Sequence, residues 1–301
     1  MQPTIELKDS YGRPVKSLRI SITERCNLNC IYCHNEGSEG SQEEMTPTEI
    51  ANIVKVGTEY GIWKVKFSGG EPLVRKDFEE ILRNLPPLKD VSVTTNGIYL
   101  EERAKGLKEA GLDRVNVSLD SLDPECYGKI ICRSPKLHKK VLEGIDAAVE
   151  VGLTPVKLNM VLLKGINDDQ IDEMMKFTRK YHGKVVLQLI QLMDFNETSR
   201  FQVNAENIEK MLAEKADEIR VRTMHRRRKY MIDGTEVEVV RPVDNTEFCA
   251  RCNRLRVTAD GKFKPCLLTN DNLVDTKGAS IEELRELFKL AVKKRVPYNR
   301  R

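Results

Sequence analysis

The sequence lacks several features that would define whole classes of protein. No run of about 18 apolar residues occurs in its 301 residues, and the N-terminal MQPTIELKDS has no apolar h-region. Neither a membrane span nor a signal peptide is indicated, so we expect a cytoplasmic location. Solenoid repeats and low-complexity linkers are also absent. The 40% hydrophobic and 32% charged composition is typical of a globular protein, long enough for one large α/β barrel or two smaller domains.

A strong net charge is absent too, because 50 basic and 46 acidic residues leave only +4. Part of this charge is local, since the segment RVRTMHRRRKY at 220–230 carries six Arg and Lys residues. Such a run is typical of a solvated basic face or hairpin. The alternative is an electropositive surface beside an anionic ligand such as a triphosphate. No aromatic residues interleave these charges, as they would in a binder of single-stranded nucleic acid.

Eight cysteines are present, and their tight spacing favours metal binding over disulfides in a chain without a signal peptide. Six of them form two triplets, the first spaced C-x3-C-x2-C and the second C-x2-C-x13-C. The triplets are Cys26, Cys30, Cys33 and Cys249, Cys252, Cys266. We interpret the other two, Cys126 and Cys132, as free thiols.

Strand-like and helix-like segments alternate through the first two thirds of the chain. Short runs typical of strands lie at 18–24, 64–70, 91–97, 114–120, 155–165 and 184–194. Helical patterns separate them, and the first begins at Thr46 with Pro47 and Glu49 as capping signals. This order indicates an α/β fold of βα units, whose right-handed crossovers curl a parallel sheet into a partial or full barrel.

The alternation ends at about residue 195. We expect residues 1–195 to form a partial βα barrel of about six units, and residues 196–301 to form a C-terminal α+β extension that closes one end of it. Within the extension the pattern predicts a helix at 204–216, a hairpin strand at 235–243 and a final helix at 280–294.

Polar loops and the first triplet follow the predicted strands, where barrel enzymes hold their active sites. A zinc site requires four protein ligands, and neither triplet has an obvious fourth. His34 adjoins Cys33, but so short a turn brings both to one metal poorly. A [4Fe–4S] cluster fits better, because three thiolates leave one iron free to bind a substrate or cofactor. The other features at these strand ends are Ser68-Gly69-Gly70-Glu71-Pro72, Thr94-Thr95-Asn96-Gly97, Ser118 and Met193.

The first triplet and the loop SGGEP at 68–72 resemble the radical S-adenosylmethionine (SAM) superfamily. The resemblance implies a radical SAM partial TIM barrel, in which the open iron of a cluster held by the first triplet binds the amino and carboxylate groups of SAM. It also implies SAM contacts by Tyr32, which precedes the third cysteine, and by Gly70, where a Cβ would crowd the ligand. Ser118 and Met193 match two further positions that contact SAM.

The second triplet, with its embedded CNRLR, resembles the GTP 3′,8-cyclase family (MoaA) of molybdenum-cofactor biosynthesis. The match extends from Leu18 to about Leu267, and it implies a second [4Fe–4S] cluster whose free iron binds the guanine ring of GTP. Arg254 and Arg256 alternate in a strand-like segment, so both can point to one side. The GTP-binding residues that the resemblance implies are Arg19, Lys66, Thr94, Lys157, Arg254, Leu255 and Arg256.

The same resemblance implies a reaction and its partners. A 5′-deoxyadenosyl radical made from SAM abstracts the hydrogen at C3′ of GTP, and the product is (8S)-3′,8-cyclo-7,8-dihydroguanosine 5′-triphosphate. The chemistry then belongs to the cluster and SAM, with no catalytic side chain of the protein. A reduced electron donor, a downstream cyclic pyranopterin monophosphate synthase and a homodimer are implied as partners, and neither nucleic acid nor a membrane is.

Three positions depart from the pattern of this family. Lys66 stands where the family usually has arginine, which keeps the charge but loses bidentate geometry. Gln188 and Gln191 stand in the sixth strand where the family usually has an arginine and a glutamate. The sequence also ends in KKRVPYNRR instead of the Gly-Gly tail that inserts into the active site of family members.

Two other functions stay open at this point. One is a different radical SAM enzyme with an auxiliary cluster, such as a peptide maturase, although such enzymes generally carry more cysteines. The other is a zinc-stabilised basic protein that binds RNA through residues 220–230. The second leaves the loops at 68–72, 94–97 and 116–121 without a role.

Overall fold

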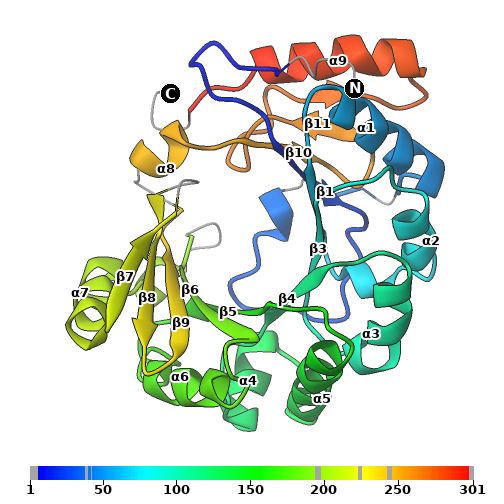
Figure 1. Cartoon of the computed structure of the whole chain (residues 1–301). Coiled ribbons are helices and arrows are strands. Elements are labelled where there is room, and N and C mark those ends of the chain that lie inside the picture. The colour runs from blue at the N-terminus through cyan, green and yellow to red at the C-terminus, as the bar shows by residue number, and fades with distance from the viewer. Residues whose placement is uncertain are drawn as a thin grey trace.

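The strands of the chain form one twelve-stranded sheet in the computed structural model (Figure 1). The structure describes residues 6–37, 40–41, 43–193, 198–222, 226–242 and 246–297. The centre of the basic run (223–225) and the C-terminal residues 298–301 lie outside the described residues. The strands are β1 (Ser17–Ser21), β2 (Lys64–Ser68), β3 (Asp90–Thr95), β4 (Arg114–Ser118), β5 (Val156–Leu162), β6 (Val185–Gln191), β7 (Glu218–Val221), β8 (Arg228–Ile232), β9 (Thr235–Val240), β10 (Arg254–Val257), β11 (Lys262–Lys264) and β12 (Val274–Asp275).

Helices cover the convex side of this curved sheet (Figure 1). Helix α1 packs against α2 and α9, and α3 packs against α5. In the described parts of the chain, no helix is both long enough and apolar enough to cross a bilayer. The helices are α1 (Pro47–Glu59), α2 (Phe78–Arg83), α3 (Leu100–Glu109), α4 (Pro124–Ile131), α5 (Leu137–Glu150), α6 (Ile171–Arg179), α7 (Ala205–Lys215), α8 (Thr246–Ala250) and α9 (Ile281–Lys293), with short 3-10 turns η1 (Asn35–Gly37), η2 (Pro72–Val74) and η3 (Ser199–Phe201).

The strands follow the order β12-β11-β10-β1-β2-β3-β4-β5-β6-β9-β8-β7. Every neighbouring pair from β10 to β9 is parallel, which confirms the predicted α/β fold of βα units β1 to β6. The C-terminal region, which we expected to close one end of the barrel, contributes strands at both edges of the parallel sheet. It adds β10 beside β1 and β9 beside β6, so it covers both exposed edges of the parallel sheet. The domain boundary at residue 195 stays a prediction, because a single sheet spans it.

The two faces of the barrel sheet differ in polarity because side chains alternate along each strand. In β5, Val156, Leu158 and Met160 are fully buried, while Lys157 and Asn159 between them are partly exposed. The apolar set packs under the helices and forms the core. The polar set faces the concave side, so the interior of this barrel is lined by charged and polar groups rather than filled by aliphatic layers.

Local signals account for where the helices begin. Thr46 and Glu49 form the predicted capping box at the start of α1, with Pro47 in the first turn. Ser280 forms the equivalent cap of α9. The βα pattern does not predict the short α4, although its Asp123 cap accepts a hydrogen bond from the backbone of Cys126. This helix matters because it lies against the first cysteine loop.

Candidate active site

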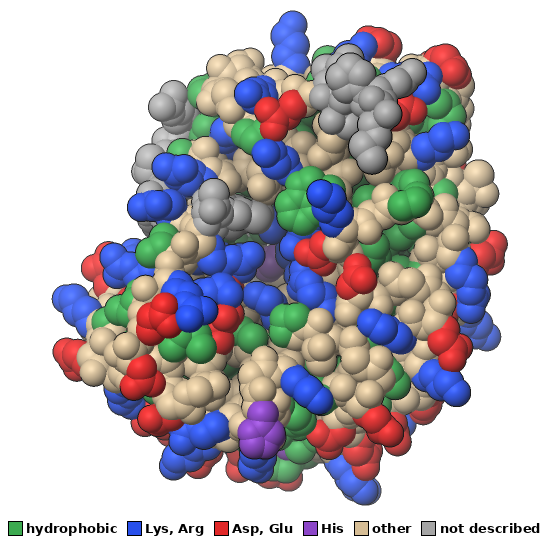
Figure 2. Space-filling model, viewed as in Figure 1, with side chains coloured by type: hydrophobic (Ala, Val, Ile, Leu, Met, Phe, Trp, Pro, Cys, Tyr) green, Lys and Arg blue, Asp and Glu red, His purple; other side chains and the backbone are tan. Residues whose placement is uncertain are grey.

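The candidate site lies on the concave side of the sheet, toward the carboxyl ends of the parallel strands. The segment that follows β1, coloured blue in Figure 1, crosses the opening of the curved sheet and carries the first cysteine triplet. In Figure 2 the same face is hollowed at its centre, and Lys and Arg side chains gather around the hollow. The geometry therefore places the cysteine loop and a strongly cationic interior together.

Two glycines allow the loop after β2 to contact the backbone of the cysteine loop. The amide of Gly70 donates to the carbonyl of Thr23 at 2.8 Å. A Cβ on Gly70 would lie 2.3 Å from the carbonyl oxygen of Arg25, and one on Gly69 would lie 2.2 Å from that of Thr23. Gly69 also has a φ of 143°, which favours glycine. In this structure the close approach that requires glycine is to the chain itself.

Glu71 joins the second and third strand-end loops. Its buried carboxylate accepts from the Thr95 hydroxyl and from the Asn96 amide, each at 2.6 Å. The side chain of Asn96 then donates to Asn27 Oδ1 in the cysteine loop at 2.7 Å. The three loops are thus one hydrogen-bonded unit, which fixes the cysteines relative to the sheet.

Helix α4 supports the cysteine loop from its other side. The amides of Asn29 and Ile31 donate to the carbonyls of Ile131 and Ile130 at 3.2 and 3.0 Å. These carbonyls belong to the last turn of α4, where no intrahelical donor is available. The helix end and the loop therefore satisfy one another's backbone groups.

Tyr32 is held by a residue that the sequence did not single out. Its hydroxyl donates to Asp120 Oδ2 at 2.6 Å, and Asp120 Oδ1 accepts from the amide of Val161 at 2.9 Å. Burial raises the pKa of Asp120 to about 6, although both hydrogen bonds act to lower it. Asp120 follows β4 by two residues, so it ties the cysteine loop to the fourth and fifth strands.

The three thiols of the first triplet lie near one another at the edge of the hollow. Cys26 and Cys33 are exposed and Cys30 is partly buried. Burial, the Asp120 carboxylate and the other two thiols hold the pKa of Cys30 well above its usual range. Three thiolates in such a place repel one another, and a bound iron–sulfur cluster would supply the positive charge that stabilises them.

The arrangement of donors fits a cubane better than a single metal ion. Within the described ranges, no three His, Cys, Asp or Glu side chains converge as ligands of one metal ion. A zinc site needs such convergence. A [4Fe–4S] cluster does not, because each thiolate binds a different iron. Three thiols without a fourth protein ligand suit a cluster, and Cys26, Cys30 and Cys33 would be the residues that hold it.

The second triplet lies where the C-terminal region joins β1. Cys249 is in α8, Cys252 precedes β10, and Cys266 follows β11. All three side chains are partly buried. Strand β10 pairs with β1, so this triplet lies at the side of the parallel strands opposite to β9.

Buried guanidiniums support this second triplet. Arg13 donates to the carbonyl of Cys249 at 2.9 Å, and Arg295 donates to the carbonyl of Cys252 at 2.6 Å. Asp9 pairs with both arginines, at 2.8 and 3.3 Å. Burial alone would raise the pKa of Cys252, but Arg295 and the neighbouring arginines outweigh it and lower the pKa. The cysteine motif gives no signal for these supporting arginines, because they are far from the cysteines in the chain.

One wall of the hollow carries the arginines of β1 and β10. Arg19 and Arg256 are in register on neighbouring strands and share Glu36, at 3.6 and 2.6 Å. Burial would raise the pKa of Glu36, but these arginines lower it to about 2. Lys66 is in register with Arg19, and burial with repulsion from Arg19 holds its pKa well below the usual range. Burial and the same arginines also lower the pKa of Arg254.

The opposite wall is built around Glu238 of β9. Lys157 Nζ lies 3.6 Å from its carboxylate, and Arg222 and Arg227 lie 2.9 and 3.4 Å from it. Gln188, in register with Glu238, donates a hydrogen bond to the same group. Burial lowers the pKa of Lys157 to about 8 even though Glu238 acts to raise it.

Several buried polar atoms around the hollow have no hydrogen-bond partner in the part of the chain that the structure describes. Such atoms are costly unless a ligand or water satisfies them. Two belong to predicted GTP-binding residues, Arg19 and Thr94. The atoms are Arg19 Nε, Ser68 Oγ, Ser92 Oγ, Thr94 Oγ1, Asn159 Oδ1, Gln191 Oε1 and Arg227 Nε.

The remaining predicted residues are not all brought to the hollow. Ser118 ends β4 and is partly exposed, and Met193 follows β6 by two residues and is partly exposed. Leu255 is fully buried, in register with Leu18 on the apolar face of the sheet. Only the backbone of Leu255 is therefore available to a ligand between Arg254 and Arg256.

Alternation along the strands could have identified more of this site. The rule that selected Lys157, a polar residue inside an apolar strand, applies equally to Arg114 and Asn116 in β4. Glu238 in TEVEVV follows the same rule. Asp120 gave no such signal, because it lies beyond the end of its strand.

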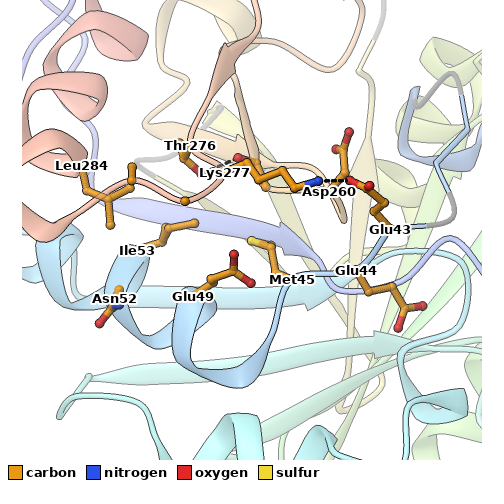
Figure 3. Close-up of a pocket in the computed structure, with 13 residues that line it drawn as sticks. Glu43, Glu44, Met45, Glu49, Asn52, Ile53, Asp260, Thr276, Lys277 and Leu284 are labelled. Carbon is orange, nitrogen blue, oxygen red and sulfur yellow. Dashed lines mark hydrogen bonds and ion pairs between the residues drawn. The ribbon is translucent and has the colours of Figure 1, made fainter.

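A cavity on the convex side does not belong to this site. Its volume is about 300 Å³, and it is lined by α1, the turn between β10 and β11, and the segment from Thr276 into α9. Figure 3 shows the side chains that line it. Glu43, Glu44, Glu49 and Asp260 line it, and its Lys277 pairs with Glu43 at 2.7 Å. This acidic lining repels a triphosphate, which the cationic hollow attracts.

Two sequence families match successive parts of the chain. The family described as the Radical SAM superfamily matches residues 20–178, and that described as Molybdenum Cofactor Synthesis C matches residues 185–300. A protein named "Probable GTP 3',8-cyclase" from Methanosarcina acetivorans is 63% identical over 299 residues, covering 97% of this chain and 90% of that protein. One of the same name from Methanocaldococcus jannaschii is 46% identical, covering 97% and 99%.

Solved structures with the same fold are more distant in sequence. "Native anSMEcpe with bound AdoMet" superposes with a TM-score of 0.64 at 20% identity, covering 91% of this chain and 81% of that one. Streptococcus suis SuiB bound to precursor peptide SuiA gives 0.65 at 14% identity, covering 90% of this chain and 64% of that one. At these identities the likeness concerns the fold alone.

Proposed function

The chain belongs to the radical SAM superfamily and, within it, to the family of GTP 3′,8-cyclases, and we propose that it carries out their reaction. The substrate is GTP and the product is (8S)-3′,8-cyclo-7,8-dihydroguanosine 5′-triphosphate, made for molybdenum-cofactor biosynthesis. One observation carries the proposal. A cysteine loop at either side of the hollow frames an interior whose unsatisfied cations match a nucleoside triphosphate.

SAM and an iron–sulfur cluster are the cofactors of this superfamily. We assign the cluster to Cys26, Cys30 and Cys33, and SAM to Tyr32, Gly70, Ser118 and Met193. When bound, they supply a 5′-deoxyadenosyl radical that abstracts the hydrogen at C3′ of GTP. The hydrogen-bonded unit of Glu71, Asn96 and Asn27 keeps the cysteine loop fixed, so that the reacting atoms meet in one geometry.

A second [4Fe–4S] cluster at Cys249, Cys252 and Cys266 is the finer part of the proposal. Arg13 and Arg295 hold the carbonyls of two of these cysteines, and the lowered pKa of Cys252 favours the thiolate that iron binds. The guanine ring is assigned to the open iron of this cluster.

The triphosphate is assigned to the cations between the two cysteine sites. Side chains of Arg19, Lys66, Thr94, Lys157, Arg254 and Arg256, with the backbone of Leu255, form its binding set. Their burial strengthens each charge pair, because a low-dielectric interior screens charges less than water does. A reduced electron donor, a cyclic pyranopterin monophosphate synthase that consumes the product, a homodimer and a cytoplasmic location stay predictions.

Anaerobic reconstitution with iron and sulfide tests the proposal. We expect about eight irons per chain, four in each cubane. With dithionite and SAM, 5′-deoxyadenosine should form with GTP and not with ATP, and the cyclised nucleotide should accumulate. SAM cleavage that is indifferent to GTP would leave a radical SAM enzyme with another substrate.

Cysteine variants separate the two clusters. Cys252→Ala should halve the iron content and abolish the GTP-dependent product while the first cluster remains. Cys126→Ser is the matched control, because Cys126 is a partly buried cysteine outside both triplets. Four irons in the parent protein, unchanged by Cys252→Ala, would remove the second cluster from the proposal.

A further inference from the structure

The basic run of the sequence forms a hairpin whose cations point to two different places. Strands β7 and β8 pair antiparallel, and the amide of Arg222 extends the ladder to the carbonyl of Arg227 at 2.8 Å. Arg220 lies on the outer side, where it forms an exposed pair with Glu218 at 2.6 Å. Arg222 and Arg227 instead turn toward the hollow, where both reach Glu238.

The pair with Glu238 does not explain Arg227. The Glu238 carboxylate is fully buried and has Arg222, Lys157 and Lys229 within 2.9, 3.6 and 3.9 Å. Arg227 lies 3.4 Å from Glu238. Without Arg227 the Glu238 carboxylate would still be paired with the other three cations. A fourth cation beside one buried carboxylate adds desolvation cost and like-charge repulsion without satisfying a further group.

Arg227 also has a hydrogen-bond donor that the described residues leave unused. Its Nε is buried and has no hydrogen-bond partner among the described residues. Burial lowers its pKa to about 10, and repulsion from Arg222 and Arg19 contributes. Its own charge lowers the pKa of Arg254 across the hollow. The guanidiniums of Arg19, Arg227 and Arg254 therefore act on one shared low-dielectric space.

Charges around this space are strongly unbalanced in the described structure. Glu36 and Glu238 pair with the cations of the two walls, and Asp90 beside them is already paired with Lys64 and Arg114. A buried excess of positive charge is stable only when an anion of high charge enters. The cations are Arg19, Lys66, Arg254 and Arg256 on one wall and Lys157, Arg222, Arg227 and Lys229 on the other.

We propose that Arg222 and Arg227 of the β7–β8 hairpin bind the terminal phosphates of the nucleoside triphosphate, opposite Arg19 and Arg256. This inference rests on the proposed function for the identity of the nucleoside, but not for the anion. The planar fork of arginine suits phosphate oxygens, and Arg227 Nε supplies an unused donor. The hairpin thereby forms the part of the site that distinguishes nucleotides by the number of their phosphates.

Nucleotide binding measured on the anaerobic holoenzyme tests this assignment. Affinities for GTP, GDP, GMP and guanosine are compared in the parent protein, Arg227→Gln and Arg222→Gln. Each variant should bind GTP about 10- to 100-fold more weakly, the range expected for a lost charge-assisted contact. Guanosine affinity should change less than about 2-fold, since surface changes remote from a ligand contribute little. The preference for GTP over GMP should therefore collapse.

Matched variants exclude indirect effects. Arg220→Gln removes a cation from the same hairpin on its exposed side and should leave all four affinities unchanged. Arg227→Lys, which keeps the charge, should recover part of the GTP affinity. Thermal unfolding of each variant checks the fold. If Arg227→Gln proves unfolded, Arg222→Gln decides alone, because its side chain is more exposed.

The result that overturns the proposal is an equal loss for GTP and guanosine, or no loss at all. ATP and inorganic triphosphate separate this failure from failure of the proposed function. If the parent binds ATP as well as GTP and Arg227→Gln weakens both, the phosphate site stands and the GTP assignment fails. If the parent forms product from GTP and Arg227→Gln binds GTP normally, the function stands and this inference fails.

Discussion

Each cysteine triplet supplies three thiols, but the two triplets lie in opposite electrostatic surroundings. Burial and the Asp120 carboxylate raise the pKa of Cys30 in the first triplet. At the second triplet, Arg295 and Arg254 outweigh burial and lower the pKa of Cys252. Nothing in the cysteine spacing foretells this difference. Two sets of three cysteines can therefore differ in the charge around their thiols, which the tertiary structure sets.

The supports of the two triplets differ as well. The first loop is held by backbone contacts with neighbouring strand-end loops, and these require Gly69 and Gly70. The second triplet is held by side chains, chiefly Arg13 and Arg295. A backbone contact is broken by one added methyl group, whereas a side-chain support is broken by removing its charge. The following experiments use this difference, from the largest expected effect to the smallest.

Gly70→Ala should disrupt the first site and spare the second. Its Cβ would lie 2.3 Å from the Arg25 carbonyl oxygen and 2.6 Å from that of Glu24. We expect about half of the iron to be lost and SAM cleavage to fall by about 100-fold, because displacement by about 1 Å has such an effect. Iron analysis and 5′-deoxyadenosine formation measure both. Gly106→Ala in α3 is the control, with its nearest atom at 3.8 Å; equal effects of both variants would contradict the assignment.

Arg295→Gln should destabilise the fold around the second site. Arg295 is 1% exposed, donates to the Cys252 carbonyl at 2.6 Å and lies 3.3 Å from Asp9. Losing these buried contacts should cost about 3 kcal/mol of unfolding free energy. Urea unfolding measures this cost. Arg285→Gln, which breaks an exposed pair with Glu59, should cost less than about 1 kcal/mol. A loss at Arg295 no greater than at Arg285 would show that the support is dispensable.

The two clusters should differ in reduction potential. Positive neighbours stabilise the added electron and negative neighbours oppose it, so the second cluster should be reduced first. A separation of about 60 mV corresponds to one tenfold step for a one-electron couple. Anaerobic titration followed by electron paramagnetic resonance resolves the two steps. Cys252→Ala should remove the reduction step at the higher potential. If it removes the step at the lower potential instead, the first cluster is the one that is reduced first, and the prediction is wrong.

Asp120→Asn should change how stability depends on pH at the first site. The pKa of Asp120 is raised from 3.8 to about 6, so its ionisation opposes folding as pH rises between these values, and the full cost applies above pH 6. Asparagine cannot ionise and escapes this cost. Relative to the parent, the variant should therefore gain about 1 kcal/mol between pH 5 and pH 8. Urea unfolding at both pH values tests the sign. The same gain in Asp172→Asn, an exposed aspartate on α6, would disprove it.

The sequence by itself determined the order of the βα units and the positions of the two cysteine triplets. Strands β1 to β6 and the caps of α1 and α9 follow from local periodicity and capping residues, which act within a few positions. The triplets are read directly, because a cluster requires thiolates at close spacing. These features need no information about distant parts of the chain.

Only the tertiary structure decided which charges meet. Register places Arg19 beside Arg256 and Gln188 beside Glu238, although each pair is far apart in sequence. Alternation along a strand indicates that a side chain faces the hollow, but it does not indicate which side chain of another strand lies beside it. The basic run divides into exposed and inward cations for the same reason. Strand order and register are set by packing of the whole sheet. They bring charged residues from distant parts of the chain together in one cationic interior.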